Sequence, residues 1–336
     1  MMVSQPDRQK LPFEQHTAAD EAAAKVTGSA VLLGAGFSKW AVDLPLADEL
    51  FDYQIHVWGP RDDHRLRIVA ALKQDWEARH PGGAAEEFVA YGLRQSRRQR
   101  EAVLWYIGRR LCEPFVRRSL LLRRERRYVL TIDDKAKLEI PGITEARRFL
   151  SQLCASVTPG IITTNYDMVV EYALGSRVFN YGRLGQHLLG SGPFPLSQWK
   201  YPVVLRGRVP LAKLHGSVSW DRRGCYADGR RGITGRALIV APTPEKRPPS
   251  ELADTWQLAH RILSEAQRIL VFGFAFNQYD RAVLELLRTA GGGLRQVLLV
   301  DIYPPTGRAR EVWPNAAVTA AEPTPDGLKT VEDWWR

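Results

Sequence analysis

Cysteine is scarce in this chain. Only Cys112, Cys154 and Cys225 are present among 336 residues, and no two of them form a C-x-x-C pair. This spacing argues against a disulfide framework and against a structural zinc site, because both need closely spaced cysteines. Few and separated thiols are typical of a reducing compartment, so we expect a cytoplasmic protein without a metal.

Long apolar runs are missing as well. No stretch approaches the roughly 18 apolar residues of a membrane-spanning helix, and residues 1–10 are polar, so we expect neither a membrane segment nor a signal peptide. Hydrophobic residues make up 45% of the chain and charged residues 25%, which excludes disordered and collagen-like classes. A chain of 336 residues can form one large domain, or one domain with a sizeable insertion.

Acidic residues are rare in one basic segment. Between Arg94 and Arg127 there are twelve arginines, no lysine and three glutamates, a net charge of +9, whereas the whole chain carries +10. Three interpretations stay open for this segment. It is a solvated helix face packed on the rest of the protein, a contact for an acidic partner or a second copy, or a nucleic-acid surface.

The pattern of apolar residues divides the chain into three parts. Residues 1–27 form an arm with a short helix at 18–26, residues 59–142 form a basic helical insertion, and residues 28–58 with 143–336 alternate strands and helices. We therefore predict an α/β fold, with a Rossmann-like parallel sheet, helices on both of its faces and a helical insertion or small domain. The predicted strands are 30–33, 160–163, 178–180, 203–205, 212–215, 237–241, 268–272 and 296–300. The predicted helices are 46–55, 66–80, 84–100, 102–111, 114–127, 144–156, 168–174, 251–266 and 280–290.

Ligands of an open parallel sheet bind beyond the carboxyl ends of the strands, so the residues that follow each strand are the candidates. The first strand is followed by Gly34-Ala-Gly-Phe-Ser38. Glycines permit a tight turn and a close approach to a phosphate, and the next helix offers free N–H groups. Alternatively, this turn only connects a strand to a helix.

Two later strand ends carry polar groups. The string Thr163-Thr-Asn-Tyr-Asp167 places an amide and a carboxylate directly after a buried strand, where Asn165 or Asp167 alternatively caps the next helix. His215 follows another strand and has Gly216 beside it, which leaves room for a ligand. An imidazole there is suited to act as a base, although a structural histidine is the simpler interpretation.

Taken together, these segments resemble the sirtuin family, and most of all its zinc-free bacterial branch of NAD-cleaving domains from antiphage defence systems. The resemblance covers about residues 28–58 and 143–305. The motifs that carry it are Gly34-Ala-Gly-Phe-Ser38 with Leu44-Pro45, Thr163-Thr-Asn-Tyr-Asp167, Leu214-His-Gly216, Gly273-Phe-Ala-Phe-Asn277 and the strand that ends at Asp301.

The resemblance implies a role for each matching residue. Asn165 would hold the nicotinamide ribose or the attacking water, Asp167 would lie near the nicotinamide end, and His215 would be the base that faces the ribose hydroxyls. The residues implied to contact NAD are Gly34, Ala35, Gly36, Phe37, Ser38, Pro45, Thr163, Thr164, Gly273, Phe274, Asn277 and Asp301. Among these, Ala35, Gly36 and Ser38 would meet the pyrophosphate, and Asp301 would meet the adenosine end.

The chain departs from the deacetylating members of this family. Leu46-Ala-Asp follows Pro45 where those members have Asp-Phe-Arg, the zinc-binding cysteine pairs are missing, and Ala275 stands where serine is common. These departures favour plain cleavage of NAD over deacetylation. The resemblance thus implies an NAD glycohydrolase that produces ADP-ribose and nicotinamide, uses NAD as its substrate, and serves as the effector of an abortive-infection system.

Other functions compete with this one. The chain alternatively senses NAD or ADP-ribose without turnover, or binds nucleic acid through the segment from Arg94 to Arg127, or, least of all, removes acyl groups from proteins. An NAD hydrolase needs restraint in its host, so we expect a homo-oligomer or a partner defence protein of the ATPase or nuclease type.

Overall fold

The computed structural model describes residues 28–53, 55, 57, 59–126, 142–175, 178–182, 207–221, 224–225, 238–243 and 248–336, without the side chains of 114–126, 221 and 224–225. The predicted helix at 18–26 and the predicted strand at 203–205 lie outside these residues. None of the described helices is both long and apolar enough to cross a membrane.

A parallel sheet of seven strands forms the centre of the molecule, and it runs in the order β11-β10-β9-β1-β2-β4-β3. Most of the residues in its central strands are fully buried, because helices cover both faces and each strand is a continuous apolar run. The strands are β1 (Ser29–Leu33), β2 (Gly160–Thr163), β3 (Phe179–Asn180), β4 (Val209–Lys213), β9 (Arg268–Phe272), β10 (Gln296–Val300) and β11 (Ala317–Ala321).

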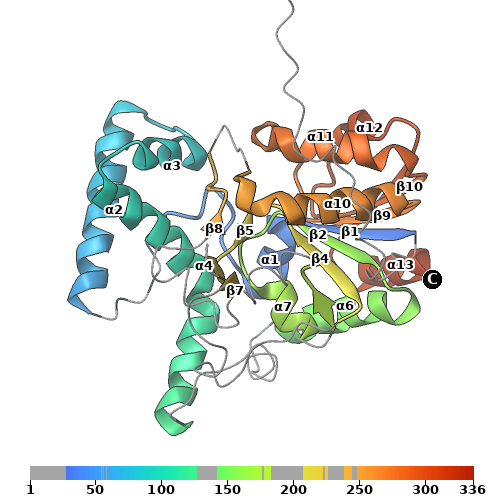
Figure 1. Cartoon of the computed structure of the whole chain (residues 1–336), viewed down its shortest axis with the longest axis horizontal. Helices are drawn as coiled ribbons and strands as arrows, with labels where there is room; N and C mark the ends of the chain where they lie inside the picture. The colour runs from blue at the N-terminus through green and yellow to red at the C-terminus, as the bar shows by residue number, and fades with distance from the viewer. Residues whose placement is uncertain are drawn as a thin grey trace, which may run out of the picture.

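Two helical layers enclose this sheet (Figure 1). One layer consists of α10 (Ala253–Glu265), α11 (Arg281–Ala290) and α12 (Thr306–Val312). The other consists of α1 (Ala35–Val42), α6 (Ile143–Ser156), α7 (Val169–Leu174) and α13 (Pro325–Trp335). The predicted α/β class with helices on both faces is thus confirmed.

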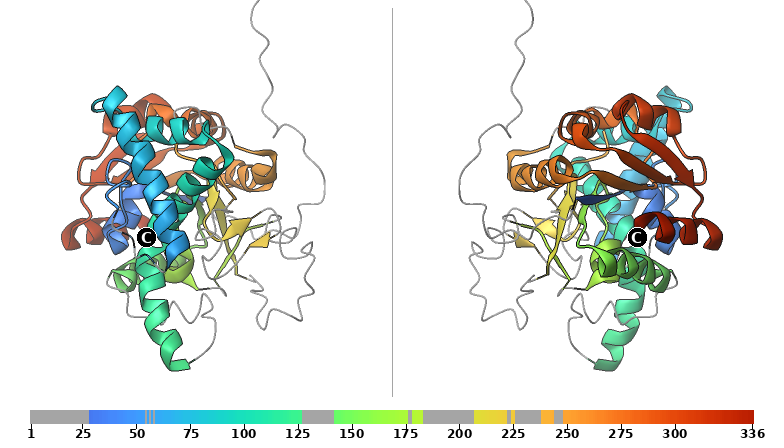
Figure 2. Two further views of the ribbon diagram at one scale, coloured as in Figure 1. Left: turned by 90° about the vertical axis from the view of Figure 1, so that its left-hand side faces the viewer. Right: turned by 90° about the vertical axis from the view of Figure 1, so that its right-hand side faces the viewer.

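A group of three helices follows α1 in the chain: α2 (Pro60–Arg79), α3 (Ala85–Leu93) and α4 (Arg97–Arg126). They pack on one another and stand beyond the end of the sheet at which β1 runs into α1 (Figures 1 and 2). Arg110 joins this group to the α/β part, because its guanidinium binds both oxygens of Asp52 at 2.9 and 2.6 Å. The helical insertion predicted from the sequence therefore faces the carboxyl ends of the strands.

Several predicted elements within this region were wrong in their bounds. The predicted helix 84–100 is interrupted at residues 94–96, where Ser96 and Gln99 form a reciprocal cap that starts α4. The predicted helices 102–111 and 114–127 are one helix, which continues past Pro114 although proline removes a backbone donor. The predicted helix 46–55 is a turn, in which the Glu49 carboxylate accepts from the Leu46 N–H.

The remaining differences are small ones. Strand β4 begins three residues before the predicted 212, and the predicted strand 237–241 is the short β8 (Leu238–Ile239), which pairs antiparallel with β5 (Gly216–Ser217). A second antiparallel pair joins β6 (Trp220–Asp221) to β7 (Gly224–Cys225). Three single turns of 3₁₀ helix are η2 (Ser250–Leu252), η3 (Gln278–Asp280) and η4 (Gly291–Gly293). The elements β11, α12 and α13 were not predicted.

The turns after β1 and β9 touch backbone to backbone, and glycines make this contact possible. Gly36 donates its N–H to the Gly273 carbonyl at 2.9 Å, and Gly273 has a positive φ of 64°. A Cβ atom on Gly273 would lie 2.3 Å from the Phe37 nitrogen, and one on Gly34 would lie 2.3 Å from the Gly273 oxygen. No side chain fits between these two turns, so the central strand ends are locked together.

We expect Gly273→Ala to lower the free energy of unfolding by more than about 3 kcal/mol, since the methyl group overlaps fixed backbone atoms. Gly28→Ala is the matched control. Gly28 also has a positive φ, of 68°, but no atom lies within 4 Å of its Cβ position, so strain alone should cost about 1 kcal/mol. Urea denaturation of both variants measures the difference, and equal losses would show that the backbone contact is not tight.

Candidate active site

The candidate residues all follow parallel strands, so they lie along one edge of the sheet. From β1 the chain continues to β2, the neighbouring strand on one side. From β9 it continues to β10, which lies on the opposite side, so the direction in which strands are added to the sheet reverses between β1 and β9. This reversal is the topological switch point at which open α/β sheets bind ligands. The glycine turn at Gly34 and the loop at Gly273 flank it.

Hydrogen bonds connect the ends of β1 and β2. The Thr163 hydroxyl donates to the Leu33 carbonyl at 2.8 Å and accepts from the Asn165 N–H at 3.0 Å. The Asn165 amide nitrogen donates to the Gly34 carbonyl at 2.8 Å and to the Ser38 hydroxyl at 2.9 Å. Both amide hydrogens of Asn165 are therefore used to join the two loops, which leaves its side-chain oxygen as the atom that can meet a ligand.

The first turn of α1 is engaged in the same way. Gly34 donates its N–H to the Phe272 carbonyl at 2.9 Å, and the Gly36 N–H is taken by Gly273. Phe37 is fully buried among Trp40, Phe149 and Phe272. The glycines thus serve the packing of the two loops, and Ala35 is the exposed residue of this turn.

Asp167 lies in a buried polar cluster under α7. Its carboxylate accepts from the Val169 N–H at 2.9 Å, as a helix cap does. The buried Lys213 ammonium donates to the Asp167 backbone carbonyl and pairs with Glu171 at 2.7 Å, and the Tyr181 hydroxyl donates to the same Glu171 oxygen. Each charged group in this cluster therefore has an opposite or polar group beside it.

Burial is the main cause that raises the pKa of the Asp167 carboxyl above its ordinary 3.8. The Lys213 charge, the Val169 N–H and the Ser38 hydroxyl act in the opposite direction, and Glu171 adds to the rise. The proton is therefore held more tightly in the folded protein than in the unfolded chain.

His215 lies directly against the Asn165 loop. Its Nδ1 is 3.0 Å from the Thr164 carbonyl, and its ring stacks on Tyr166 with 5.7 Å between the centroids. A carbonyl oxygen only accepts, so Nδ1 carries a hydrogen and donates it. This bond fixes the orientation of the ring and turns Nε2 away from the loop.

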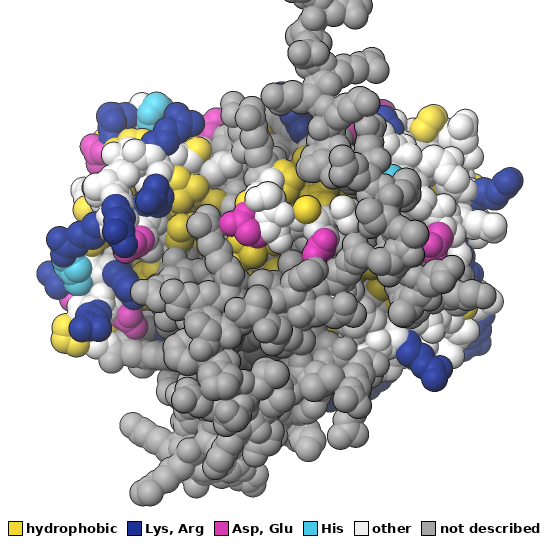
Figure 3. All heavy atoms as spheres, viewed as in Figure 1, with side chains coloured by type: hydrophobic (Ala, Val, Ile, Leu, Met, Phe, Trp, Pro, Cys, Tyr) yellow, Lys and Arg dark blue, Asp and Glu magenta, His cyan; other side chains and the backbone are white. Residues whose placement is uncertain are grey.

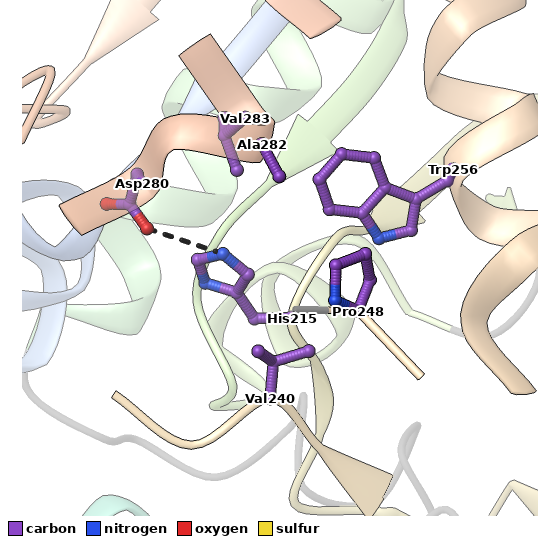
Figure 4. A pocket seen from close by; sticks show the side chains of 7 residues that line it. All are labelled: His215, Val240, Pro248, Trp256, Asp280, Ala282 and Val283. Atoms are coloured by element: carbon purple, nitrogen blue, oxygen red, sulfur yellow. Dashed lines mark ion pairs between the residues drawn. The ribbon is translucent and has the colours of Figure 1, made fainter. Parts of the chain in front are cut away.

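Asp280 faces that second nitrogen, and sequence reasoning missed it. Its Oδ1 lies 3.5 Å from His215 Nε2 (Figure 4). Asp280 ends η3 and precedes α11, so the sequence pattern shows only a carboxylate in front of an apolar helix. Only the tertiary packing that places the start of α11, with Ala282 and Val283, beside His215 brings it to the histidine.

A small pocket of about 170 Å³ of empty space adjoins this pair. Its other walls are apolar: Val240, Pro248, Trp256, Ala282 and Val283 (Figure 4). That figure includes open solvent at the surface, and between the lining side chains there is no room for a water molecule, so the pocket does not by itself hold a ligand. The Trp256 indole N–H donates to the Leu214 carbonyl at 2.9 Å and holds this wall against the His215 strand end.

The helical insertion also reaches the site. Glu86 of α3 is buried, and its charge and that of Asp280 help burial to raise the pKa of Tyr166 well above the usual range, burial being the larger cause. Tyr166 belongs to the Asn165 loop and stacks on the His215 ring, so the insertion contributes a carboxylate near the residue that packs on the histidine.

Other predicted residues have local structural roles. Asn277 caps η3 through the Tyr279 N–H, and Asp301 accepts from the Tyr303 N–H at 3.0 Å. Pro45 and Phe274 are buried. The loop after β9 is held by Arg308, which donates to the carbonyls of residues 275 and 276. None of these observations tests whether the residues contact NAD.

The basic segment is only partly a surface. Arg94, Arg97, Arg98 and Arg100 are exposed, and Lys and Arg side chains gather over the α2 side of the molecule (Figure 3). Arg109 and Arg110, in contrast, are buried beside Glu113 and Asp52. Both arginines are interior groups, so among the described side chains of this segment the exposed basic face is formed by Arg94, Arg97, Arg98 and Arg100.

Within the part of the chain that the structure describes, no three His, Cys, Asp or Glu residues come close enough together to hold a metal ion. Neither Cys112 nor Cys154 forms a disulfide with another of the described residues.

Several solved structures are similar to this chain, and two of them are sirtuin structures. One, described as "Structural Basis for the Mechanism and Regulation of Sir2 Enzymes", matches 93% of this chain and 92% of its own, with 14% identity and a TM-score of 0.39. The other, a Sir2 mutant with a p53 peptide and NAD, matches 92% of each chain, with 13% identity and a TM-score of 0.36. At these TM-scores the similarity carries no conclusion about ligand or activity. No family model and no curated protein matches the chain.

We expect Asp167→Asn to change how stability depends on pH. The pKa of Asp167 is raised in the folded protein, so burying its carboxyl costs the most free energy when the group is ionised. The free energy of unfolding of the wild type therefore falls as pH rises from about 4 through the raised pKa. The variant avoids this cost while still accepting the Val169 N–H, so its advantage in the free energy of unfolding should grow toward neutral pH.

Urea denaturation at several pH values measures this effect, with Asp48→Asn, at an exposed position, as the control. Parallel pH profiles for wild type and Asp167→Asn would show that the buried carboxyl does not hold its proton as described.

Proposed function

We propose that this protein is an NAD glycohydrolase, which hydrolyses NAD to ADP-ribose and nicotinamide. The observation that carries the proposal is the junction of Asn165 and His215 through Thr164, at the switch point of a Rossmann-like sheet and beside the glycine turn. An amide oxygen, an oriented imidazole and a helix N-terminus are groups that can serve this reaction.

The chemistry makes modest demands on the protein. The bond between the ribose C1′ and the pyridinium nitrogen breaks, and its electron pair neutralises the ring, so nicotinamide leaves without a proton from a general acid. The ribose becomes an oxocarbenium-like cation that water attacks at C1′. One proton of that water must leave, and the fixed His215 ring offers Nε2 as its acceptor.

The surrounding residues would orient the substrate. In this proposal the Asn165 side-chain oxygen faces the ribose or the water, because its nitrogen is bound to Gly34 and Ser38. The exposed start of α1 at Ala35 meets the pyrophosphate with the positive end of the helix dipole. The loops at Gly273 and Asp301 lie on the same sheet edge, toward the adenosine end.

The biological setting is part of the proposal. Unrestrained hydrolysis would deplete NAD in the host, so the enzyme would act as the effector of an antiphage abortive-infection system, restrained until a partner ATPase or nuclease, or assembly into an oligomer, activates it. The sirtuin-like motifs support this setting.

A second candidate function is the sensing of NAD or ADP-ribose without turnover. The engagement of Asn165 and Asp167 in structural hydrogen bonds favours it, since both residues have full roles in the fold without any substrate.

We expect His215→Ala and Asn165→Ala to lower NAD consumption by about 10²-fold or more, because each removes a group that acts on the ribose or the water. Purified protein is assayed with and without neighbouring gene products. His64→Ala, on α2, controls for loss of an imidazole elsewhere, and thermal unfolding checks that each variant folds.

Full activity in both site variants would show that the site is assigned wrongly. Tight NAD binding by calorimetry, with no turnover under any activating condition, would instead favour the sensing function.

A further inference from the structure

Four arginines of the helical insertion gather where α2 meets the start of α4, on the side of the molecule where basic side chains are visible in Figure 3. Arg65 lies on α2, and Arg97, Arg98 and Arg100 lie in the first turn of α4. The two helices touch here, because the Arg98 guanidinium contacts the ring of His64, the residue before Arg65. These four arginines are called the arginine cluster below.

One carboxylate, that of Glu101, lies among these arginines. Arg97 donates to it at 2.9 Å, and this hydrogen bond is the main cause that lowers the pKa of Glu101. The charges of Arg97, Arg100 and Arg65 lower that pKa further, so three arginines act on a single carboxylate. Four guanidinium groups against one carboxylate leave a net charge of +3. Among the described residues, none forms an ion pair with Arg65, Arg98 or Arg100.

The cluster is accessible to a large anion. Arg97, Arg98 and Arg100 are exposed, whereas Arg65 is half-buried because its guanidinium lies over the Trp105 ring, 5.6 Å from the centroid. Residues 60–72 and 94–101 contain no lysine, so every cation here is an arginine. A guanidinium is weakly hydrated and binds a phosphate through two parallel hydrogen bonds, which suits it to phosphate recognition.

The apolar centre that a protein partner needs is missing from this surface. Within the described part of the chain, the exposed large hydrophobic side chains are Ile302 and Tyr303, which follow β10 and do not lie on α2 or α4. Protein interfaces depend on a buried aromatic or aliphatic centre, whereas nonspecific binding of nucleic acid depends on neutralised phosphates. Single strands also stack their bases on exposed aromatic rings. These observations together favour the backbone of a duplex.

We propose that the arginine cluster binds the phosphate backbone of a double-stranded nucleic acid without reading its sequence. Each guanidinium that meets a phosphate releases counterions, so the affinity depends strongly on salt. The cluster shares no residue with the candidate active site. The inference therefore goes beyond the proposed function and holds whether or not the protein cleaves NAD.

Fluorescence anisotropy with a labelled DNA duplex of mixed sequence, at several salt concentrations, tests this proposal. We expect the wild type to bind with micromolar affinity at low salt and to lose affinity steeply as salt rises. The triple variant Arg97→Gln, Arg98→Gln, Arg100→Gln should bind at least about 10-fold more weakly. The magnitude of its salt slope should fall by about 1 for each phosphate contact that is removed.

A matched control removes the same charge from exposed arginines on the other side of the molecule (Figure 1). The control variant is Arg288→Gln, Arg295→Gln, Arg310→Gln. It should bind nearly as tightly as the wild type. Equal losses in the two triple variants would show that binding follows the overall charge of +10 and would overturn the proposal.

Two further ligands separate the competing partners. Tighter binding of a single-stranded RNA of equal length would overturn the assignment to a duplex. A poly-glutamate peptide that binds as tightly as the duplex at the same salt would overturn it in favour of an acidic protein partner. Absence of duplex binding by the wild type at low salt would overturn it in favour of a solvated helix face. These wild-type measurements decide the matter even if a variant does not fold, which thermal unfolding checks.

Discussion

The hydrogen bonds from the end of β2 into the end of β1 determine the geometry of the whole site. Thr163 and Asn165 bind Leu33 and Gly34 across loops that are 130 and 131 residues apart in the chain. Because the Thr164 carbonyl lies between them, the same loop also orients His215. Had this loop a different path, the His215 Nδ1 would lose its bond to the Thr164 carbonyl and the glycine turn would lose its bond from Asn165.

Glycine backbone contacts and buried charges support this arrangement from two sides. The turns after β1 and β9 approach so closely that only glycine fits, which keeps the switch point rigid. Beneath the Asn165 loop, Lys213 binds the Asp167 carbonyl and Glu171, so a buried charge is compensated by the same segment that it holds in place. Breaking one member of such a cluster leaves another charge buried alone, which is costly.

The helical insertion has two faces with different roles. Its inner side is joined to the α/β part by the ion pair of Arg110 with Asp52. On the same side, the charge of Glu86 helps to raise the pKa of Tyr166. On its outer side, exposed arginines alternate with acidic residues, as in the pairs of Arg67 with Asp63 and Arg97 with Glu101. A sequence charge of +9 over 94–127 is therefore not the charge of one surface, because two of its arginines are interior groups.

Local patterns in the amino-acid sequence were enough to predict the α/β class, most of the sheet strands and the edge on which the candidates lie. Continuous apolar runs such as 268–272, broken by glycine or polar residues, are local signals that survive folding unchanged. The sequence also contains the capping pair Ser96 and Gln99, although the apolar pattern around this pair indicated one continuous helix over 84–100. Three features could be seen only in the folded protein. Asp280 faces His215, the Asn165 amide nitrogen donates to Gly34 and Ser38, and Arg109 is buried. These features depend on the packing of elements that are far apart in the chain. The apolar pattern of one helix or strand shows which of its faces is buried, but not which side chain of a distant element that face will contact.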